Sequence, residues 1–440
     1  MQKITLVTLA AGNGTRMKSK TPKPLHKIAG KTMLEHSFNC VSSLSIAKKI
    51  IVASEDLVEN SGDILDNFTV VIQQEKLGTG HAVMQCLSEI LSDSIVVISY
   101  GDTPFVRPET IENMVEKARN GWDIVVLGST VSDVSQKYGR LVMNGENLLE
   151  IIEYKDADEK TRASAFCNSG MIVAKSDVLI SALERVVPKN VSKEYYLTDI
   201  VKIAVNMGKK ATCSVCEEGE VMGVNSRIDL AAAEKYYQKI LRKKHMENGV
   251  TMLNPKTVYF SWDTILENDI TLEGNIHFGT GVFVKNGSII KAFSHLERCE
   301  VGADCVVGPF ARIRPNSRLE NSVHIGNFVE IKASNLESGV KIGHLSYIGD
   351  ASVGENTNIG AGTITCNYDG FEKHKTTIGA GVFVGSNTCF IAPIEVKNNV
   401  ITAAGSVISK DVPENSIAIA RAEQKNIENG AQRFRSRRKK

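Results

Sequence analysis

A glycine-rich loop near the start of the chain has the residue types of a phosphate-binding loop. The apolar run Ile4–Leu9 leads directly into Ala10-Ala11-Gly12-Asn13-Gly14-Thr15-Arg16-Met17. When glycines and a basic residue follow a strand, backbone N–H groups can point at phosphate oxygens and the chain can approach them closely. The loop lacks the third glycine of a dinucleotide fingerprint and the Gly-Lys-Ser/Thr of a P-loop. Taken alone, it is therefore also compatible with a plain tight turn.

Two further side chains have the types that phosphate chemistry needs. Lys23 lies between Pro22 and Pro24, which keep the backbone stiff and extended. Asp102 follows the apolar run Ile95–Ser99, and the carboxyl edge of a parallel sheet is where open α/β folds bind ligands. A carboxylate there suits Mg²⁺, which takes one or two protein ligands together with phosphate oxygens. A single aspartate after a strand is also often only a turn residue or a helix cap.

A histidine in the second half of the chain has the chemistry for proton transfer. His344 occurs in Gly343-His344-Leu345-Ser346-Tyr347, and imidazole titrates near neutrality, so it can serve as a general base. An isolated histidine is also commonly a structural residue. Shortly after it, the segment Gly360–Lys373 interrupts a regular repeat with Asn, Tyr and Lys residues. Such an insertion on a rigid scaffold predicts a binding loop.

The element that must position His344 is a hexapeptide repeat that is regular from Val301 to Ile408. Aliphatic residues recur at every sixth position and are often followed by glycine, which is the signature of a parallel β-helix with three hexads per triangular coil. The aliphatic side chains point inward, and glycine occupies bends where a Cβ would clash. Two series define the register: Val301, Val307, Ile313, Leu319, Ile325 and Ile331, then Ile378, Val384, Phe390, Val396, Thr402 and Ile408. A solenoid of this kind can also serve only to hold subunits together.

The element that must position Lys23 and Asp102 is a mostly parallel α/β sheet. Apolar runs alternate with helical patterns from residue 3 to about residue 227. The expected strands are Ile4–Leu9, Lys49–Ala53, Val70–Ile72, Ile95–Ser99, Ile124–Leu127 and Met171–Ala174. The expected helices are Gly78–Leu91, Pro108–Ala118 and Leu197–Asn206.

A chain of 440 residues is too long for one ordinary core, so two or three domains are expected. We assign residues 1–227 to the α/β domain, 228–250 to a linker helix, 251–421 to the β-helix and 422–440 to a basic tail. The linker helix is predicted from the spacing of Leu230, Ala233, Tyr237 and Leu241.

The composition describes a soluble globular protein, with a formal net charge of only +2. Six basic residues lie between Arg433 and Lys440, so the rest of the chain is mildly acidic. It therefore lacks the excess of basic residues that is typical of a nucleic-acid-binding protein. Nine scattered cysteines predict free thiols in a reducing compartment. The pair Cys213 and Cys216 is either a partial zinc site or packed strand cysteines. No segment approaches the roughly 18 apolar residues of a membrane span, so we expect a cytoplasmic protein without a membrane partner.

The amino-terminal motifs resemble those of sugar-phosphate uridylyltransferases, a nucleotidyltransferase family. The match consists of residues 9–17, then Pro22-Lys23, then Gln73 and the segment Leu77-Gly78-Thr79-Gly80-His81, which in that family reads the uracil base. The resemblance implies that Arg16 and Lys23 stabilise phosphates and that Asp102 and Asn225 hold Mg²⁺. It implies nucleotide and sugar contacts at Leu9, Ala10, Ala11, Gly12, Lys23, Gln73, Gly78, Thr79, Tyr100, Gly101, Asp102, Gly139, Glu153, Asn168 and Asn225. Ser169 stands where that family more usually has threonine.

The carboxyl-terminal motifs resemble those of hexapeptide-repeat acetyltransferases, whose fold is a left-handed parallel β-helix. The resemblance implies that His344 is the general base and that the Ala361 N–H faces the oxyanion. It implies phosphate and sugar contacts at Arg314, Lys332, Lys373, Tyr347, Asn358 and Asn367, and an acetyl-CoA site at Ala361, Asn367, Tyr368, Ser386, Ala404 and Arg421. Adjacent subunits build such sites in that family, so a homotrimer is implied. The basic tail either contacts the 3′-phosphate of the coenzyme or is simply solvated.

Both resemblances occur in one chain and in this order, over roughly residues 4 to 421. This is similar to the family of bifunctional N-acetylglucosamine-1-phosphate uridylyltransferases/glucosamine-1-phosphate N-acetyltransferases. It implies acetyl transfer from acetyl-CoA to glucosamine 1-phosphate, then uridylyl transfer from UTP to N-acetylglucosamine 1-phosphate. The products would be pyrophosphate and UDP-N-acetylglucosamine, a precursor of cell wall and lipopolysaccharide.

Two alternatives remain to be compared with this interpretation. A single-activity sugar nucleotidyltransferase with a structural β-helix is not expected to carry His344, Tyr347 and Lys373 together. A non-catalytic assembly subunit would be expected to have lost Lys23, Asp102 or Asn225, and the chain keeps all three. The sequence therefore favours neither alternative.

Overall fold

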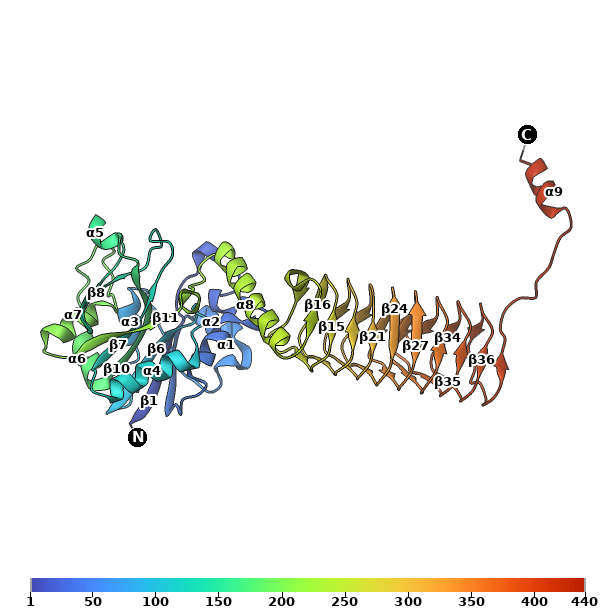
Figure 1. Ribbon diagram of the computed structural model, residues 1–440, viewed down its shortest axis with the longest axis horizontal. Helices are drawn as coiled ribbons and strands as arrows, with labels where there is room; N and C mark the ends of the chain where they lie inside the picture. Colours follow the sequence, from blue (N-terminus) through green and yellow to red (C-terminus); the bar gives the residue numbers. More distant parts are fainter. Residues whose placement is uncertain (1, 439–440) are drawn as a thin grey trace. The chain divides into compact units, whose positions relative to one another are not determined.

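The computed structural model describes residues 2–438 and separates into two compact units (Figure 1). The amino-terminal unit extends to Tyr237 and the carboxyl-terminal unit begins at Gln238, so the division falls within helix α8 (Arg227–Glu247). The last two residues of the predicted basic tail, Lys439 and Lys440, lie outside the described residues. None of the described helices is both long and apolar enough to cross a membrane.

The amino-terminal unit is built on one twisted sheet with strand order β11-β7-β10-β6-β1-β4-β5. These strands are β1 (Lys3–Leu9), β4 (Lys48–Ala53), β5 (Thr69–Ile72), β6 (Ser94–Tyr100), β7 (Ile124–Thr130), β10 (Phe166–Lys175) and β11 (Ala211–Cys216). Strand β1 is parallel to both of its neighbours, β4 and β6, whereas β10 is antiparallel to β6 and β7. The central strand β6 is almost entirely buried, as expected when helices cover both faces of a sheet.

The helices of this unit are α1 (Met33–Ser37), α2 (Glu55–Asn60), α3 (Thr79–Met84), α4 (Pro108–Arg119), α5 (Glu159–Arg162), α6 (Ser176–Leu183) and α7 (Asp199–Asn206). Two short strands, β2 (Lys27–Ile28) and β3 (Lys31–Thr32), pair with each other, and β8 (Arg140–Asn144) forms a hairpin with β9 (Asn147–Ile152). Local capping explains several boundaries. Pro108 occupies the first turn of α4, and Thr32 forms a capping box with Glu35 at the start of α1.

Two sequence expectations in this unit are wrong in detail. The helix expected over Gly78–Leu91 ends at Met84, because Cys86 leaves the helical region at φ −111° and ψ 12° and the chain continues as a 3₁₀ turn, Leu87–Glu89. The helix expected to begin at Leu197 begins at Asp199. The hairpin β8–β9 was not among the expected strands.

The carboxyl-terminal unit is a parallel β-helix, which confirms the solenoid predicted from the hexapeptide repeat (Figure 1). Its described strands form three flat sheets of ten, nine and eight strands. The sheets run from β12 (Thr251–Met252) to β38 (Ile417–Ala418), from β13 (Val258–Tyr259) to β37 (Val407–Ile408), and from β14 (Ile265–Leu266) to β35 (Ile394–Val396). A short helix, α9 (Gly430–Ser436), follows the last coil.

The coils stack in strict register, with one aliphatic residue above the next. In the first sheet, the residues in register are Leu272, Ile290, Val307, Ile325, Ile342, Ile359, Val384 and Thr402. Thr402 is buried at a position where an aliphatic residue would be expected. Its hydroxyl accepts from the backbone N of Gly385 at 3.2 Å and lies 3.3 Å from the hydroxyl of Thr388, which explains why a polar side chain is tolerated there.

Candidate active sites

A cavity of about 310 Å³ opens at the carboxyl ends of β1 and β6. These parallel strands end in register, with Leu9 opposite Tyr100, and the backbone N of Gly101 donates to the carbonyl of Leu9 at 3.0 Å. The cavity is therefore formed where sequence reasoning expected ligand binding. Its lining includes these predicted site residues: Leu9, Ala10, Ala11, Gly12, Lys23, Gln73, Gly78, Thr79, Tyr100, Gly101 and Asp102.

The glycine loop approaches Lys23 so closely that one glycine is required. Gly14 has φ +56°, and a Cβ there would lie 2.7 Å from the Cβ of Lys23. The loop then forms a 3₁₀ turn, Thr15–Met17, which buries Met17. Arg16 belongs to the same turn, is exposed, and is not part of the cavity lining. The structure thus brings Lys23 to the cavity and leaves Arg16 outside its lining.

The ammonium group of Lys23 joins the two residues predicted to hold a metal. It forms an ion pair with Asp102 and lies 3.1 Å from Oδ1 of Asn225. The backbone N of Val224 donates to the carbonyl of Asp102 at 3.0 Å, which ties the segment that carries Asn225 to the end of β6. The Lys23 side chain is only 11% exposed, so its charge is partly withdrawn from water.

The donor set of Asp102 and Asn225 fits a hard divalent cation. One carboxylate oxygen and one amide oxygen converge on a single point, which Lys23 Nζ now occupies. Mg²⁺ prefers oxygen donors and commonly uses one or two protein ligands beside phosphate oxygens. Within the described residues, no group of three or more His, Cys, Asp or Glu side chains gathers at one point. Cys213 and Cys216 lie on β11, and burial raises the pKa of both thiols to about 12.

The three predicted sugar contacts lie together, beside the cavity lining rather than within it. The backbone N of Asn168 donates to the carbonyl of Gly139 at 2.8 Å, and a Cβ on Gly139 would lie 3.5 Å from a carboxylate oxygen of Glu153. Burial raises the pKa of Glu153, which accepts a hydrogen bond from the hydroxyl of Thr198 at 3.0 Å. Arg140, which follows Gly139, is fully buried and donates to several backbone carbonyls, so it fixes this loop.

Five residues of the cavity lining were not among the predicted contacts: Asn13, Pro24, Lys76, Ala82 and Glu194. Lys76 and Asn13 form a hydrogen bond with each other and both line the cavity, as does Glu194. Asn13 belongs to the glycine loop, and Lys76 comes directly before the segment matched to uracil recognition. The sequence motifs located these segments, but only the fold brings the two side chains into contact.

In the solenoid, His344 lies at the end of β27 (Lys341–His344), beside β24 (His324–Asn327). Its Nδ1 lies 2.8 Å from Oδ1 of Asn327, the residue directly opposite in the strand pairing. The coils approach closely here, because a Cβ on Gly326 would lie 1.8 Å from the carbonyl oxygen of Gly343. The glycines that precede Asn327 and His344 therefore allow the side chains to meet.

Four predicted residues occupy the same corner of successive coils. Each comes directly before a residue whose backbone has a positive φ in the left-handed region. The backbone hydrogen bonds that stack this corner run from Gly362 to the carbonyl of His344, from Asn387 to that of Ala361, and from Gly405 to that of Ser386. We call this set the corner column: His344, Ala361, Ser386 and Ala404. Arg421 extends it, because its guanidinium donates to the carbonyl of Ala404 at 2.8 Å.

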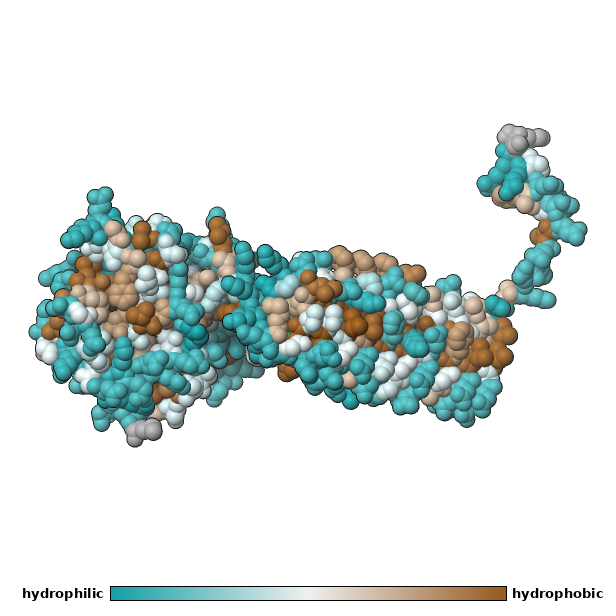
Figure 2. Space-filling model, in the orientation of Figure 1, coloured by the Kyte–Doolittle hydropathy of each residue, from teal (hydrophilic) through white to brown (hydrophobic). Residues whose placement is uncertain are grey.

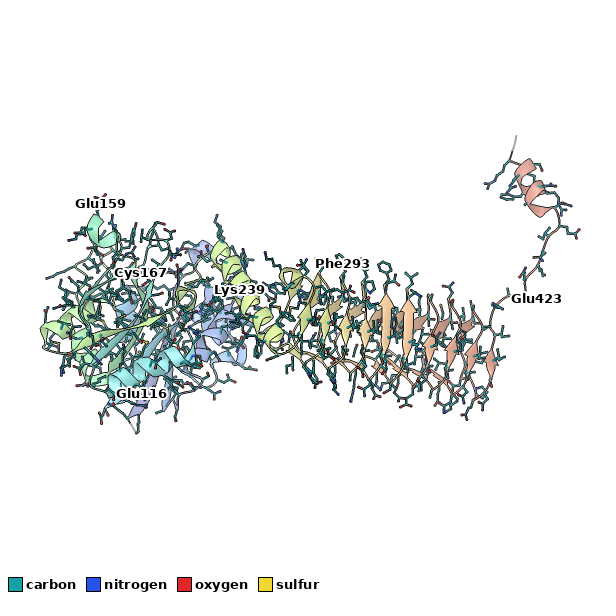
Figure 3. All side chains as sticks on the ribbon, viewed as in Figure 1. Glu116, Glu159, Cys167, Lys239, Phe293 and Glu423 are labelled. Carbon is teal, nitrogen blue, oxygen red and sulfur yellow. The ribbon has the colours of Figure 1, made fainter. Side chains whose placement is uncertain are left out.

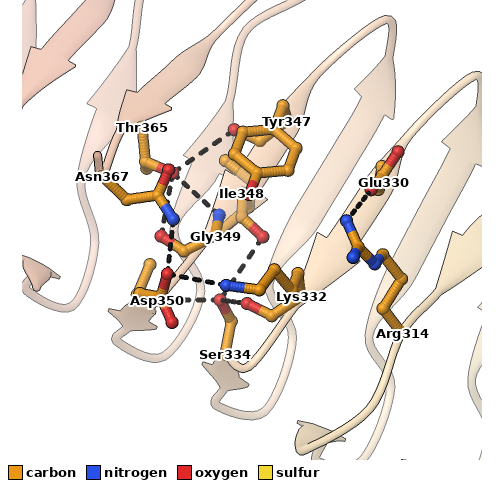
Figure 4. A network of polar contacts seen from close by, with 11 residues as sticks. Arg314, Glu330, Lys332, Ser334, Tyr347, Ile348, Gly349, Asp350, Thr365 and Asn367 are labelled. Atoms are coloured by element: carbon orange, nitrogen blue, oxygen red, sulfur yellow. Dashed lines mark hydrogen bonds and ion pairs between the residues drawn. The ribbon is translucent and has the colours of Figure 1, made fainter. Parts of the chain in front are cut away.

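Two of the three predicted phosphate-binding cations, Arg314 and Lys332, lie on the adjoining sheet, each paired with a carboxylate (Figure 4). Arg314 contacts Glu330 at 2.7 Å, and Lys332 contacts Asp350 at 2.9 Å. The hydrogen bond that Lys332 donates to Asp350 raises the pKa of Lys332, and the one that Arg314 donates to Glu330 raises the pKa of Arg314. Asp350 also accepts a hydrogen bond from the amide of Asn367, so the sheet and the insertion are joined.

The predicted binding loop is a compact hairpin turn. Tyr368 pairs with Lys373 through an isolated bridge, and Oδ1 of Asp369 accepts from two backbone N–H groups at 2.7 and 2.8 Å. His374 contacts the other oxygen of Asp369 at 2.7 Å. This arrangement presents Tyr368 and Lys373 from one ordered loop. The remaining predicted contacts, Tyr347 and Asn358, lie on β28 (Tyr347–Gly349) and β30 (Asn358–Ile359).

Comparisons with known proteins agree for both units. Residues 6–163 match the family model of the MobA-like NTP transferase domain. The bifunctional protein GlmU of Ruegeria sp. (strain TM1040) is 49% identical over 425 residues, which cover 96% of this chain and 94% of the relative. That of Paramagnetospirillum magneticum is 45% identical over 99% of this chain and 97% of the relative. The bifunctional protein GlmU of Azorhizobium caulinodans is 43% identical over 99% of this chain and 98% of the relative.

Proposed function

The chain belongs to the bifunctional GlmU family, whose members are uridylyltransferases and acetyltransferases of UDP-N-acetylglucosamine synthesis, and we propose that each unit carries out one of the two reactions. The amino-terminal unit transfers UMP from UTP to N-acetylglucosamine 1-phosphate. The carboxyl-terminal unit acetylates glucosamine 1-phosphate from acetyl-CoA. The observation that carries the first assignment is the convergence of Lys23, Asp102 and Asn225 at the edge of the cavity.

Uridylyl transfer requires positioning and charge neutralisation more than covalent help from the protein. An oxygen of the sugar phosphate attacks the α-phosphorus of UTP in line, and pyrophosphate leaves. The backbone amides of the glycine loop hold the nucleotide phosphates, and Lys23 and Arg16 neutralise their charge. Mg²⁺ held by Asp102 and Asn225 would supply further positive charge to the phosphates when bound. Gly139, Glu153 and Asn168 orient the sugar.

Acetyl transfer requires a base for the amine of glucosamine 1-phosphate as it attacks the thioester. With Nδ1–H of His344 donated to Asn327, Nε2 keeps a lone pair that can take this proton. The Ala361 N–H faces the oxyanion and the coenzyme follows the corner column, with Asn367, Tyr368, Ser386, Ala404 and Arg421 as its contacts. Arg314, Lys332 and Lys373 bind the sugar phosphate, and Tyr347 and Asn358 contact the sugar.

We also propose a homotrimer, supported by an apolar ridge on the solenoid. Phe293, Phe310 and Phe328 stack with ring-centroid distances of 4.8 and 5.2 Å, and all three are exposed. Each adopts a left-handed conformation at the same corner as Leu345, which follows His344. Figure 3 shows Phe293 standing out from the solenoid, and Figure 2 shows apolar residues along that edge. Apolar ridges of this kind are commonly covered by a partner, here a second copy.

The cysteines support a reducing compartment, and we propose the cytoplasm. All nine are free thiols, six of them buried, which fits a protein folded without disulfides. In the buried thiol Cys40, burial raises the pKa to about 12, so this side chain is unreactive near neutral pH.

The acetyltransferase assignment is tested by following thiol release from acetyl-CoA with glucosamine 1-phosphate, in the absence of UTP. Wild type should release thiol, and His344→Ala should lose on the order of a hundredfold or more in rate. The matched measurement is pyrophosphate release from UTP and N-acetylglucosamine 1-phosphate with added MgCl₂, which His344→Ala should retain. If wild type releases pyrophosphate but no thiol, the solenoid is only a scaffold and the proposed assignment is wrong.

A further inference from the structure

The amide group of Gln73 faces the nucleotide cavity and is held in a defined orientation. Gln73 is only 6% exposed, and its backbone N donates to the carbonyl of Ala53 at 3.0 Å, which fixes the chain beside β4. Its side-chain Nε2 lies 3.3 Å from the carbonyl oxygen of Gly78 and 3.1 Å from Nδ1 of His81. Both contacts fall on the same end of the amide.

The chemistry of the partners determines which end of the amide this is. A carbonyl oxygen can only accept, so the group that faces Gly78 must be the NH₂ of Gln73. The second N–H then points at Nδ1 of His81, which must also accept. The ring proton therefore sits on Nε2 of His81. The amide of Gln85 is exposed and places its Nε2 3.1 Å from that nitrogen, so this amide must turn and accept the proton with its Oε1 instead. The carbonyl of Gly78, which can only accept, thus fixes the orientation of the Gln73 amide.

The carbonyl of Gly78 is itself held rigidly. Gly78 has φ +114°, and a Cβ there would lie 2.5 Å from the carbonyl oxygen of Tyr195. The backbone N of Tyr195 donates to the carbonyl of Leu77 at 2.8 Å, and Gly80 N donates to the carbonyl of Tyr195 at 2.8 Å. The loop that orients Gln73 is thus fixed on both sides of Gly78.

The other end of the amide is left for a ligand. Among the hydrogen bonds of residues 2–438, none is donated to Oε1 of Gln73, and Gln73 lines the cavity. Oε1 therefore presents an acceptor to the base of a bound nucleotide. Uracil offers a donor at N3–H, whereas cytosine has an unprotonated acceptor at N3. An acceptor held opposite that position binds the first base and repels the second.

We propose that His81 is a positioning residue that sets the preference for UTP over CTP, by accepting the second N–H of Gln73 and so presenting its Oε1 to N3–H of uracil. This inference rests on the proposed nucleotide site. His81 does not line the cavity and acts through Gln73. Without His81, one hydrogen bond of 3.3 Å to Gly78 would hold the amide, which could then turn and offer its NH₂ to cytosine.

The test is the ratio of kcat/KM for UTP to kcat/KM for CTP in the uridylyl reaction of the full chain. Wild type should strongly prefer UTP. His81→Phe keeps an aromatic ring and removes the acceptor, so the ratio should fall by about tenfold or more. Gln74→Ala is the matched control, because Gln74 is exposed, bonds to Glu55 at 2.9 Å and does not line the cavity. It should leave the ratio unchanged.

Because thiol release reports only on the carboxyl-terminal unit, the melting curve of each variant verifies that the amino-terminal unit is folded. If the His81→Phe ratio equals that of wild type, or if wild type uses both nucleotides equally, the inference is wrong. Gln73→Ala separates this failure from failure of the proposed site. Loss of the preference in Gln73→Ala alone would overturn only the role of His81, whereas full UTP activity and preference in Gln73→Ala would overturn the base site itself.

Discussion

The hydrogen bond between Asn327 and His344 offers a direct test of the proposed base. We predict that Asn327→Ala lowers kcat/KM for acetyl transfer, because His344 loses the partner that orients its ring and fixes the proton on Nδ1. The bond is short, at 2.8 Å, and joins two neutral side chains, so its loss should cost about 0.5–1.5 kcal/mol. This corresponds to roughly a two- to tenfold decrease in kcat/KM.

A second substitution at position 327 replaces the neutral amide by a negative charge. Asn327→Asp places a carboxylate beside the ring, which favours the imidazolium, the form that cannot act as a base. The acid limb of the pH profile of kcat/KM should therefore move to higher pH. Burial lowers the pKa of His324 on the neighbouring strand β24, as do the nearby Lys291, Lys341 and His344, and these groups are unchanged in the variant.

The assay is thiol release from acetyl-CoA over a range of pH. The melting temperature of each variant is the control for folding of the solenoid, and pyrophosphate release by the same preparation is the control for the amount of enzyme. Asn321→Ala is a matched solenoid variant, because Asn321 accepts from the backbone N of Ala303 at 3.0 Å and does not contact His344. It should retain wild-type acetyl kinetics. An unchanged pH profile in Asn327→Asp, together with full activity in Asn327→Ala, would refute the reasoning.

Three further predictions follow from the geometry. Gly326→Ala should lower the melting temperature of the solenoid and abolish most acetyl transfer while leaving uridylyl transfer intact, because its Cβ would overlap the carbonyl of Gly343; calorimetry and both assays measure this. Asp369→Asn should raise KM for glucosamine 1-phosphate or acetyl-CoA by a few-fold, because it weakens the contact to His374 that orders the loop, and an unchanged KM for both would count against it. Burial raises the pKa of Glu153, so ionised Glu153 destabilises the folded state at pH values above that pKa. This destabilisation disappears as the pH falls through the folded-state pKa towards the unfolded-state pKa. Glu153→Gln should therefore have a higher melting temperature than wild type near pH 8, and the difference should shrink at acidic pH.

The sequence predicted those parts of the molecule that depend on a repeated or local pattern. The six-residue spacing of aliphatic residues such as Ile325 and Ile331 predicted the solenoid, because only a parallel coil buries every sixth residue. The motifs around Lys23 and Asp102 led us to expect both at one ligand site, and both line one cavity. The full-length bifunctional relatives confirm the function that the resemblance implied. The role of each site residue stays a prediction.

The features that the sequence did not predict are contacts between segments with no shared pattern. Gln73 and His81 were both within the matched segment, but their hydrogen bond depends on the left-handed turn at Gly78. The contact of Lys76 with Asn13 joins two loops from different parts of the chain. The corner column could have been found by aligning the hexads around His344, since its members share one phase of the repeat.

The most direct test of the central claim, that two separate sites in one chain carry two successive reactions, is a complementation measurement. The variants Lys23→Ala and His344→Ala are each tested alone and then together. Every reaction contains glucosamine 1-phosphate, acetyl-CoA, UTP and MgCl₂, and UDP-N-acetylglucosamine is quantified by chromatography. Each variant alone should form little product, and the mixture should form it at a rate approaching that of wild type, because the acetylated intermediate made by one variant is used by the other. A mixture of folded variants that stays as inactive as its components would contradict the account.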